Sequence, residues 1–231
     1  CVPDKNWVLE MSKSLSKKEI VGVQGKYQTK QNDTIAKFVQ LEIEDRYERM
    51  KNRRFIDFIG SYSAGYKKDV FIKYDGFDET FPTASGEDPE LSFKVSKDGH
   101  KMVFNEKAIV YHTHVDSVGK YLKQKFWRAY WRVLLYKKHP GKMKSESYTP
   151  QTIKLQIMLL CLFGLSLVAL PFIKESLYIS LFSILVLFLL VLPLSFKNFG
   201  KNKKVGVITP FMSILRTIVF MFGLAIGAVR V

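Results

Sequence analysis

Hydrophobic and polar positions follow two different patterns along the 231-residue chain. Up to about residue 150, short apolar stretches with strand or helix periodicity alternate with polar turns. From residue 157 onward, apolar residues continue almost without interruption. The first pattern is typical of a folded α/β domain, and the second is typical of helices that cross a membrane.

The first part of the chain predicts alternating strands and helices. Extended segments are expected over 18–29, 55–66 and 101–112, and helices over 33–52, 68–74, 89–98 and 117–138. Asn32 or Asp33 caps the first helix, and a turn at Asp75-Gly76 closes the second. This alternation predicts an α/β fold class. The front of the domain lacks a glycine-rich phosphate loop and a first strand–helix–strand unit, so we expect the domain to be incomplete there.

Three apolar runs follow, at 157–173, 177–196 and 207–229. The first two carry no charge, and the third carries only Arg216. A spanning helix needs roughly 20 mostly apolar residues, and an arginine near mid-membrane costs several kcal/mol unless it snorkels or faces protein or water. We therefore expect about three transmembrane helices within residues 151–231. Gly223 and Gly227 form a GxxxG pair of the kind that packs helices together, and the sequence identifies no partner for it.

The formal charge of the chain is +15, and the distribution of its basic residues predicts how these helices are oriented. Residues 1–150 carry 28 basic and 20 acidic side chains, whereas residues 151–231 carry eight and one. Four lysines precede the first run, one lies in the loop after it, and four lie in the next loop (Lys137, Lys138, Lys142, Lys144; Lys174; Lys197, Lys201, Lys203, Lys204). Basic loops stay in the cytoplasm, so we expect a multi-pass protein of the cell membrane whose first domain is cytoplasmic.

Two cysteines limit the chemistry of the first domain. No disulfide framework and no cysteine-based zinc site is possible within residues 2–150, which suits a reducing compartment. The chain starts at Cys1 rather than Met, which we interpret as a fragment or a processed product. The alternative is the acylated cysteine of a lipoprotein, which places the domain outside the cell and disagrees with the lysine distribution.

The expected helix over 117–138 interleaves aromatic and basic residues. Tyr121, Phe126, Tyr130 and Trp131 recur at helical spacing among seven lysines and arginines. This pattern suits a helix lying at a lipid headgroup layer, because the rings enter the interface while the cations meet phosphates. A first alternative is that the rings stack on the bases of nucleic acid. A second alternative is an ordinary core helix with one solvated face. The membrane runs nearby favour the lipid interpretation.

Two local patterns carry candidate chemistry. Asp88 stands directly before Pro89, where an N-cap belongs, so it is either a capping residue or a carboxylate acting as a general base. His112 and His114 are alternate residues at a strand end and therefore point the same way. They either bind a metal together or have a purely structural role. Two histidines without nearby carboxylates make a weak metal site.

The order of the motifs resembles the second half of a family-2 glycosyltransferase catalytic domain with the GT-A (Rossmann-like) fold. CVPDKNWV at Cys1–Val8 resembles the stretch after the metal-binding Asp-x-Asp of that family. Phe58–Phe71 resembles the segment leading to the acceptor side, and Tyr74–Asp88 resembles Gly-Gly-Phe-Asp-Glu followed by Glu-Asp, with Asp75 in place of the first Gly. Asp98–His112 resembles the closing strand that ends in His.

The resemblance implies roles for particular residues. Asp88 matches the base that deprotonates the acceptor hydroxyl, and Glu87 orients it or binds the acceptor. Gly65 belongs to the substrate-binding segment. His112 matches a position that helps to hold Mg²⁺ or Mn²⁺ on the nucleotide diphosphate, with His114 as the alternate. The implied division is 1–116 for the C-terminal part of the GT-A domain, 117–150 for the interfacial helix and linker, and 151–231 for the membrane region.

One further stretch departs from the family pattern. Gln124, Trp127 and Arg128 stand where processive members carry Gln-x-x-Arg-Trp, but Trp and Arg are reversed, which puts processivity in doubt. Arg128 is expected to meet a phosphate and Trp127 a sugar or lipid, and interfacial anchoring explains them equally well.

The resemblance implies an inverting transfer of sugar from a nucleotide sugar, a UDP-sugar first of all, to a glycan or lipid-linked acceptor, with no nucleic acid involved. The Asp-x-Asp and the nucleotide-binding half would lie upstream of Cys1, so we expect this chain alone to be inactive. Two alternatives remain. One is a membrane-anchored basic module that binds anionic lipid or nucleic acid, and the other is a non-catalytic scaffold.

Overall fold

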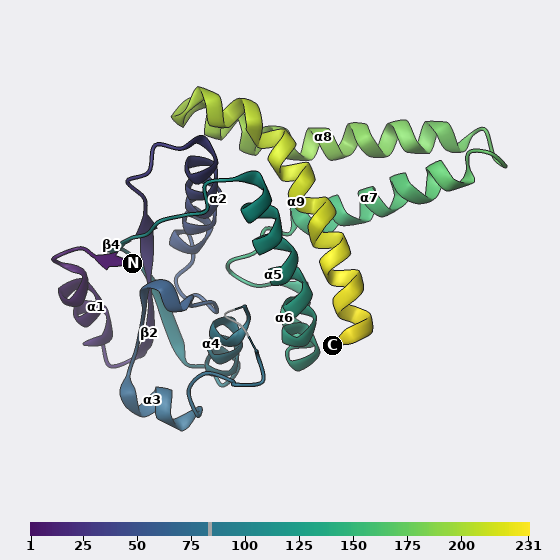
Figure 1. Cartoon of the computed structure of the whole chain (residues 1–231). Coiled ribbons are helices and arrows are strands. Elements are labelled where there is room, and N and C mark those ends of the chain that lie inside the picture. Colours follow the sequence, from purple (N-terminus) through teal and green to yellow (C-terminus); the bar gives the residue numbers. More distant parts are fainter. Residues whose placement is uncertain (83–84) are drawn as a thin grey trace. The chain divides into compact units, whose positions relative to one another are not determined.

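The computed structural model describes residues 1–82 and 85–231, and Figure 1 shows its elements. Thr83 and Ala84, which belong to the Tyr74–Asp88 motif, lie outside the described residues. The chain forms two compact units. The first contains residues 1–117, 131–149 and 230–231, and the second contains 118–130 and 150–229. Residues 117–150, expected to form a segment of their own, are thus divided between the two units.

The first unit is mixed α/β, which confirms the expected fold class at this level. Its sheet has four strands in the order β1-β4-β2-β3, with β1 at Val2–Pro3, β2 at Ile20–Gln28, β3 at Ala64–Tyr66 and β4 at Lys101–Tyr111. The two long strands, β2 and β4, pair in parallel, and both outer pairs are antiparallel. Register shifts between Ile20 and Gly22 and between Gln24 and Lys26 interrupt the central ladder, and such irregularities bend a sheet.

Helices cover both sides of the long strands, with α1 (Trp7–Leu15) and α2 (Thr34–Lys51) on opposite sides (Figure 1). Asp33 caps α2, because its carboxylate accepts hydrogen bonds from the backbone N–H groups of Ile35 and Ala36 at 2.8 and 3.0 Å. The remaining helices, in chain order, are α3 (Lys68–Lys73), α4 (Glu87–Lys97), α5 (Val118–Lys138) and α6 (Pro140–Lys144).

The turn after α3 confirms the expected stop at Asp75-Gly76. Asp75 and Gly76 have φ angles of 60° and 66°, in the left-handed region that Gly and, among other residues, Asp and Asn adopt most readily. A similar stop ends α4, where Gly99 has a φ angle of 80°. The turn at Gly99 leads directly into β4.

The expected extended segment at 55–66 is only partly a strand. Ile56 forms a single bridge to Met102, a 3-10 turn covers Ser61–Ser63, and only Ala64–Tyr66 pairs with β2. The prediction of a continuous extended stretch was therefore wrong. The physical reason is that side chains, rather than a neighbouring strand, take up the backbone hydrogen bonds of residues 59–61.

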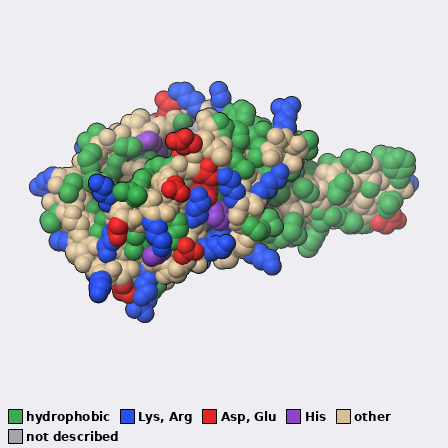
Figure 2. Space-filling model, turned by 90° about the horizontal axis from the view of Figure 1, so that it is seen from below, with side chains coloured by type: hydrophobic (Ala, Val, Ile, Leu, Met, Phe, Trp, Pro, Cys, Tyr) green, Lys and Arg blue, Asp and Glu red, His purple; other side chains and the backbone are tan. Residues whose placement is uncertain are grey.

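The second unit contains three helices that are long and apolar enough to cross a membrane: α7 (Thr152–Ala169), α8 (Ser176–Lys201) and α9 (Lys203–Arg230). This confirms the three expected apolar helices, while their orientation stays a prediction. α7 and α8 form an antiparallel pair (Figure 1). Figure 2 shows hydrophobic side chains over most of the visible surface of this pair, with charged atoms near the end where the α7–α8 turn lies.

Within the second unit, Gly223 of the GxxxG pair packs against α5. A Cβ atom at Gly223 would lie 2.6 Å from the Phe126 carbonyl oxygen and 2.9 Å from the Ala129 Cβ. Ala129 also packs with Ile153 and Phe220 in a buried apolar cluster. Glycine at position 223 therefore permits the backbones of α5 and α9 to approach closely, as small residues do between membrane helices.

Candidate functional site around Asp88

Asp88 is the second residue of α4, two positions further into the helix than the sequence predicts. The N-cap is Gly86, and the helix begins at Glu87. The prediction of Asp88 as the N-cap was therefore wrong. Glu87 satisfies the turn instead, because its carboxylate accepts hydrogen bonds from the backbone N–H groups of Ser85 and Gly86 at 2.8 and 3.0 Å. Both carboxylates lie in the first turn of the helix.

The side chain of Asp88 is directed toward the loop before β3. Its Oδ2 atom accepts a hydrogen bond from the backbone N–H of Ser61 at 3.0 Å, and the Ser61 hydroxyl lies 3.4 Å from the same oxygen. Tyr66 lies close by: burial, and then the charge of Asp88, raise the pKa of the Tyr66 hydroxyl. The phenol therefore stays protonated beside an ionised carboxylate.

A buried amide fixes the loop that holds Asp88. Gln24, in the middle of β2, is fully buried, and its Oε1 accepts a hydrogen bond from the Gly60 backbone N–H. Its Nε2 donates to the carbonyl oxygens of Gly25 and Ser63 at 2.7 and 3.2 Å. The loop is thus attached to the centre of the sheet on both sides of Ser61.

Two further hydrogen bonds hold the same loop from α4 and α1. The Ile59 backbone N–H donates to the Ser92 hydroxyl at 3.2 Å, and the Trp7 indole N–H donates to the Ser63 hydroxyl at 2.9 Å. A Cβ atom at Gly60 would lie 2.4 Å from the Tyr62 ring and 3.5 Å from Asp88 Oδ2, so glycine is required for this close approach. The position of Ser61 relative to Asp88 is therefore set by three separate elements.

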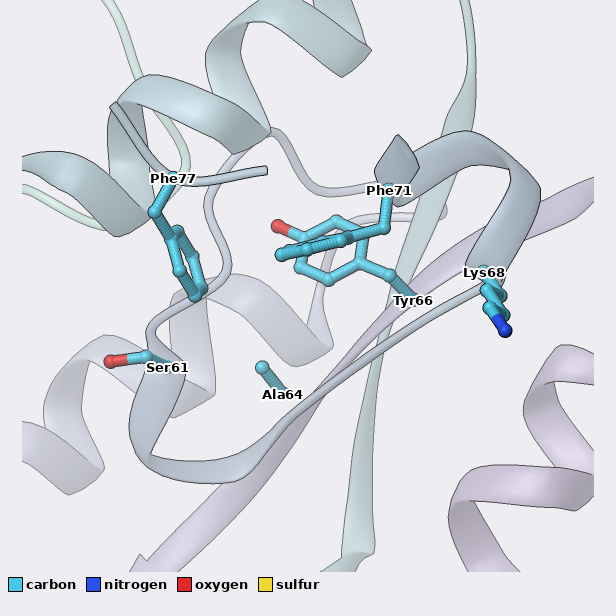
Figure 3. A pocket seen from close by; sticks show the side chains of 6 residues that line it. All are labelled: Ser61, Ala64, Tyr66, Lys68, Phe71 and Phe77. Carbon is cyan, nitrogen blue, oxygen red and sulfur yellow. The ribbon is translucent and has the colours of Figure 1, made fainter. Parts of the chain in front are cut away.

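A pocket of about 410 Å³ lies next to the Asp88–Ser61 contact. Ser61 lines this pocket and also donates its backbone N–H to Asp88. Figure 3 shows its lining residues: Ser61, Ala64, Tyr66, Lys68, Phe71 and Phe77. The Phe71 ring lies 6.2 Å from that of Tyr66 and 5.4 Å, edge to face, from that of Phe77. The pocket therefore combines aromatic surfaces with a few hydroxyl groups, and the ammonium of Lys68 points away from the rings (Figure 3).

Gly65, expected to bind substrate, faces the opposite side of β3. A Cβ atom there would lie 3.4 Å from Leu15 and 3.5 Å from Met11, both on α1. Alternate strand residues point to opposite faces, so Ala64 and Tyr66 face the pocket while Gly65 does not. Sequence reasoning missed Tyr66, Phe71 and Phe77 as lining residues. The usable signal was their place in two family-like motifs, the acceptor-side segment for Tyr66 and Phe71 and the Tyr74–Asp88 motif for Phe77.

The two predicted metal ligands lie next to each other beyond β4, with ring centroids 5.1 Å apart. His112 Nδ1 lies 3.1 Å from the Cys1 sulfur, and its ring stacks on Tyr27 at 4.5 Å. His114 is buried, and its Nε2 lies 2.8 Å from the Gln40 side-chain oxygen. Tyr27 also stacks on Tyr62, at 3.7 Å, and so connects this end of the sheet with the loop beside Asp88.

This pair alone does not fit Mg²⁺ or Mn²⁺, which take mainly oxygen ligands. Among residues 1–82 and 85–231, no group of three or more His, Cys, Asp and Glu side chains is placed to hold a metal ion. The metal role of His112 and His114 therefore stays a prediction, and we derive no step of the chemistry from it.

Gln124, Trp127 and Arg128 lie in the part of α5 that belongs to the second unit, whereas Asp88 belongs to the first. The Trp127 ring is 45% exposed and meets Phe126 and Tyr130 edge to face at 5.3 and 5.4 Å. The Arg128 side chain is exposed. This arrangement agrees with a helix that presents aromatic and basic side chains to its surroundings, and the predicted substrate contacts of these residues remain untested.

Comparisons with known proteins add no assignment to this geometry. The functional assignment therefore depends on the residues around Asp88 and on the order of the sequence motifs. Neither protein-family models nor curated proteins match the chain.

Proposed function

We propose that the chain is part of a membrane-bound, inverting glycosyltransferase of family 2, with the back half of a GT-A domain as its first unit. The donor is a nucleotide sugar, first of all a UDP-sugar, and the acceptor is a glycan or a lipid-linked sugar. The observation that carries this proposal is the hydrogen bond of the Asp88 carboxylate to Ser61, a residue that lines a pocket with aromatic walls. The ordered motifs and the three apolar helices agree with it.

The chemistry assigns Asp88 the removal of one proton. The acceptor hydroxyl gives its proton to the Asp88 carboxylate while its oxygen forms a bond to the anomeric carbon of the donor sugar. The bond from that carbon to the nucleotide diphosphate breaks, and the diphosphate leaves with the bonding electrons. Because attack and departure occur on opposite faces, the configuration at the anomeric carbon inverts.

The surroundings of Asp88 suit this role through position more than through basicity. A carboxylate at a helix N-terminus that also accepts a backbone hydrogen bond is a weak base, so it must lie within hydrogen-bond reach of the acceptor hydroxyl. The rings of Tyr66, Phe71 and Phe77 offer apolar faces against which a pyranose ring can pack. Glu87 orients the turn that carries Asp88, since its carboxylate bonds two backbone N–H groups there.

The test is Asp88→Asn in the full-length protein, with Asp75→Asn as the matched control. Both variants exchange one carboxylate for an amide, but Asp75 is exposed in a left-handed turn that Asn adopts as readily. We expect Asp88→Asn to lower kcat about 10²- to 10⁴-fold, the range for loss of a general base, with the melting temperature preserved. An unchanged kcat in Asp88→Asn would contradict the assignment of Asp88 as the base. Absence of transferase activity in the unchanged protein as well as in both variants would favour a binding module or scaffold.

A further inference from the structure

The first unit contains a second hollow that shares no lining residue with the pocket beside Asp88. It has a volume of about 490 Å³ and lies between α1, the end of α2 and the middle of β4. Six cationic side chains line it: Lys13, Lys17, Lys51, Arg53, Arg54 and Lys107. All six are exposed to solvent, and because like charges repel, an anion bound among them would reduce their mutual repulsion.

The acidic residues of the hollow do not neutralise it. Only two line it, and each is paired with a lysine: Glu10 with Lys13 at 2.9 Å and Glu106 with Lys51 at 2.8 Å. The hydrogen bonds from these lysines lower the pKa of both glutamates. In the described part of the chain, no ion pair is formed by the other four cations, Lys17, Arg53, Arg54 and Lys107. Six cations less two carboxylates leave an excess of four positive charges.

The backbone that carries these cations is fixed. The Asn105 side-chain amide donates to the Glu10 carbonyl oxygen at 3.0 Å and to the Ser14 hydroxyl at 3.1 Å, which ties β4 to α1. The Asn105 side-chain oxygen accepts from the Lys107 backbone N–H at 2.9 Å and sets the turn of the strand there. At the end of α2, the backbone N–H of Arg53 donates a hydrogen bond to the Met50 carbonyl oxygen at 3.1 Å.

We propose that this hollow binds phosphate groups of an anionic ligand that carries about three or four negative charges, such as a diphosphate or a cluster of phosphomonoesters. Guanidinium groups match phosphate oxygens in a fork, and lysines add point charges around them. A volume of about 490 Å³ accommodates more than one phosphate. The ligand is either a free phosphate compound or an anionic lipid headgroup, since both present the same chemistry. The site does not depend on the proposed transferase activity.

The experiment uses the full chain in nanodiscs of neutral phosphatidylcholine, titrated with inorganic pyrophosphate by calorimetry. The variant Arg53→Gln/Lys107→Gln removes two cations from the hollow, and the matched control Lys5→Gln/Lys137→Gln removes two exposed cations from elsewhere. We expect one saturable site that weakens about tenfold or more in the first variant and less than about twofold in the control. The extent of acetylation of Lys17 and Lys107, measured by mass spectrometry with and without pyrophosphate, locates the site. We expect bound pyrophosphate to protect both lysines from acetylation.

A second arm separates the two sources of phosphate. Nanodiscs that contain cardiolipin are compared with neutral ones, and lipid retained by the purified protein is measured by native mass spectrometry. Pyrophosphate binding with no lipid preference identifies a free phosphate compound, whereas cardiolipin retention lost in Arg53→Gln/Lys107→Gln identifies a headgroup. No binding in either arm, or equal losses in the variant and its control, would overturn the proposal.

Discussion

At the scale of single residues, the buried amide of Gln24 determines where the candidate base lies. A glutamine side chain has one acceptor and one donor group, and in this strand both are used within the core. Its partners, Gly60 and Ser63, lie on the two sides of Ser61, whose N–H holds Asp88. The site is therefore positioned by a residue that contacts no substrate in the proposed reaction.

Gln24→Leu is expected to destabilise the protein by about 2–4 kcal/mol, because the Gly60 N–H and the Ser63 carbonyl would lose buried partners. The Gln28→Leu control makes the same exchange at the half-buried end of β2 and should cost much less. Thermal unfolding in detergent, followed by tryptophan fluorescence, measures both. Equal melting temperatures for the two variants would show that Gln24 does not hold the loop.

At the scale of elements, two carboxylates hold the segment after α5 in place within the first unit. Glu90 on α4 contacts Lys94 at 3.0 Å and His139 at 3.3 Å. Asp57 contacts Lys142 on α6 at 2.6 Å and accepts a hydrogen bond from the Ser147 N–H at 2.7 Å. Together they hold residues 139–147 against α4 and the start of the loop that leads to the candidate site.

We expect these contacts to become less stable as the pH falls. Burial alone raises the pKa values of Glu90 and Asp57, but hydrogen bonds from their partners outweigh it and lower both below their ordinary values of 4.5 and 3.8. The folded pKa is the depressed one, so the stabilisation is complete above about pH 4.5 and is lost as the pH falls through the folded pKa values.

Hydrogen–deuterium exchange of residues 139–147, compared between about pH 6 and pH 3 after correction for the intrinsic rate, measures this effect. We expect faster corrected exchange at the lower pH. Glu90→Gln should show faster exchange already at pH 6, whereas the exposed Glu79→Gln should behave like the unchanged protein. Exchange that is independent of pH would show that these carboxylates do not hold the segment.

Long elements could be predicted from the sequence, while the details of the site could not. The α2 cap, the turn at Asp75-Gly76 and the three apolar helices depend on local patterns of several residues. α1 was missed although Trp7, Met11 and Leu15 recur every four residues and pack in one apolar cluster. Val8 and Leu9 fall outside this spacing and are exposed. The role of Gln24 arises from contacts with residues 36 and 39 positions away, which no local pattern contains.

At the scale of the whole molecule, charged side chains of the second unit lie mostly outside its apolar stretches. α7 and α8 are joined by residues 170–175, which contain only Lys174 and Glu175 as charged side chains. Arg216 lies in the middle of α9 but is buried, and its guanidinium contacts the Gln156 side-chain oxygen at 3.3 Å. Every charge within the apolar stretches is therefore covered by protein, which agrees with spanning helices.

The predicted orientation can be tested with single cysteines at Lys5, Lys174 and Lys203 in a background of Cys1→Ser and Cys161→Ala. We expect a membrane-impermeant maleimide to label position 174 in intact cells and to label positions 5 and 203 only after permeabilisation. Labelling at position 5 in intact cells would contradict the predicted orientation and place the first unit outside the cell. Equal labelling at all three positions would show that the helices do not span.

The short connection between α7 and α8 also has a consequence for how the protein is made. The two helices contact each other through the Ser166 and Ser180 hydroxyls, 2.7 Å apart, so they can form a pair while α9 is still in the ribosome. In the predicted orientation, only the six residues 170–175 are then translocated, and their two charges cancel. Biogenesis of this hairpin therefore requires the insertion machinery to move almost no net charge across the bilayer.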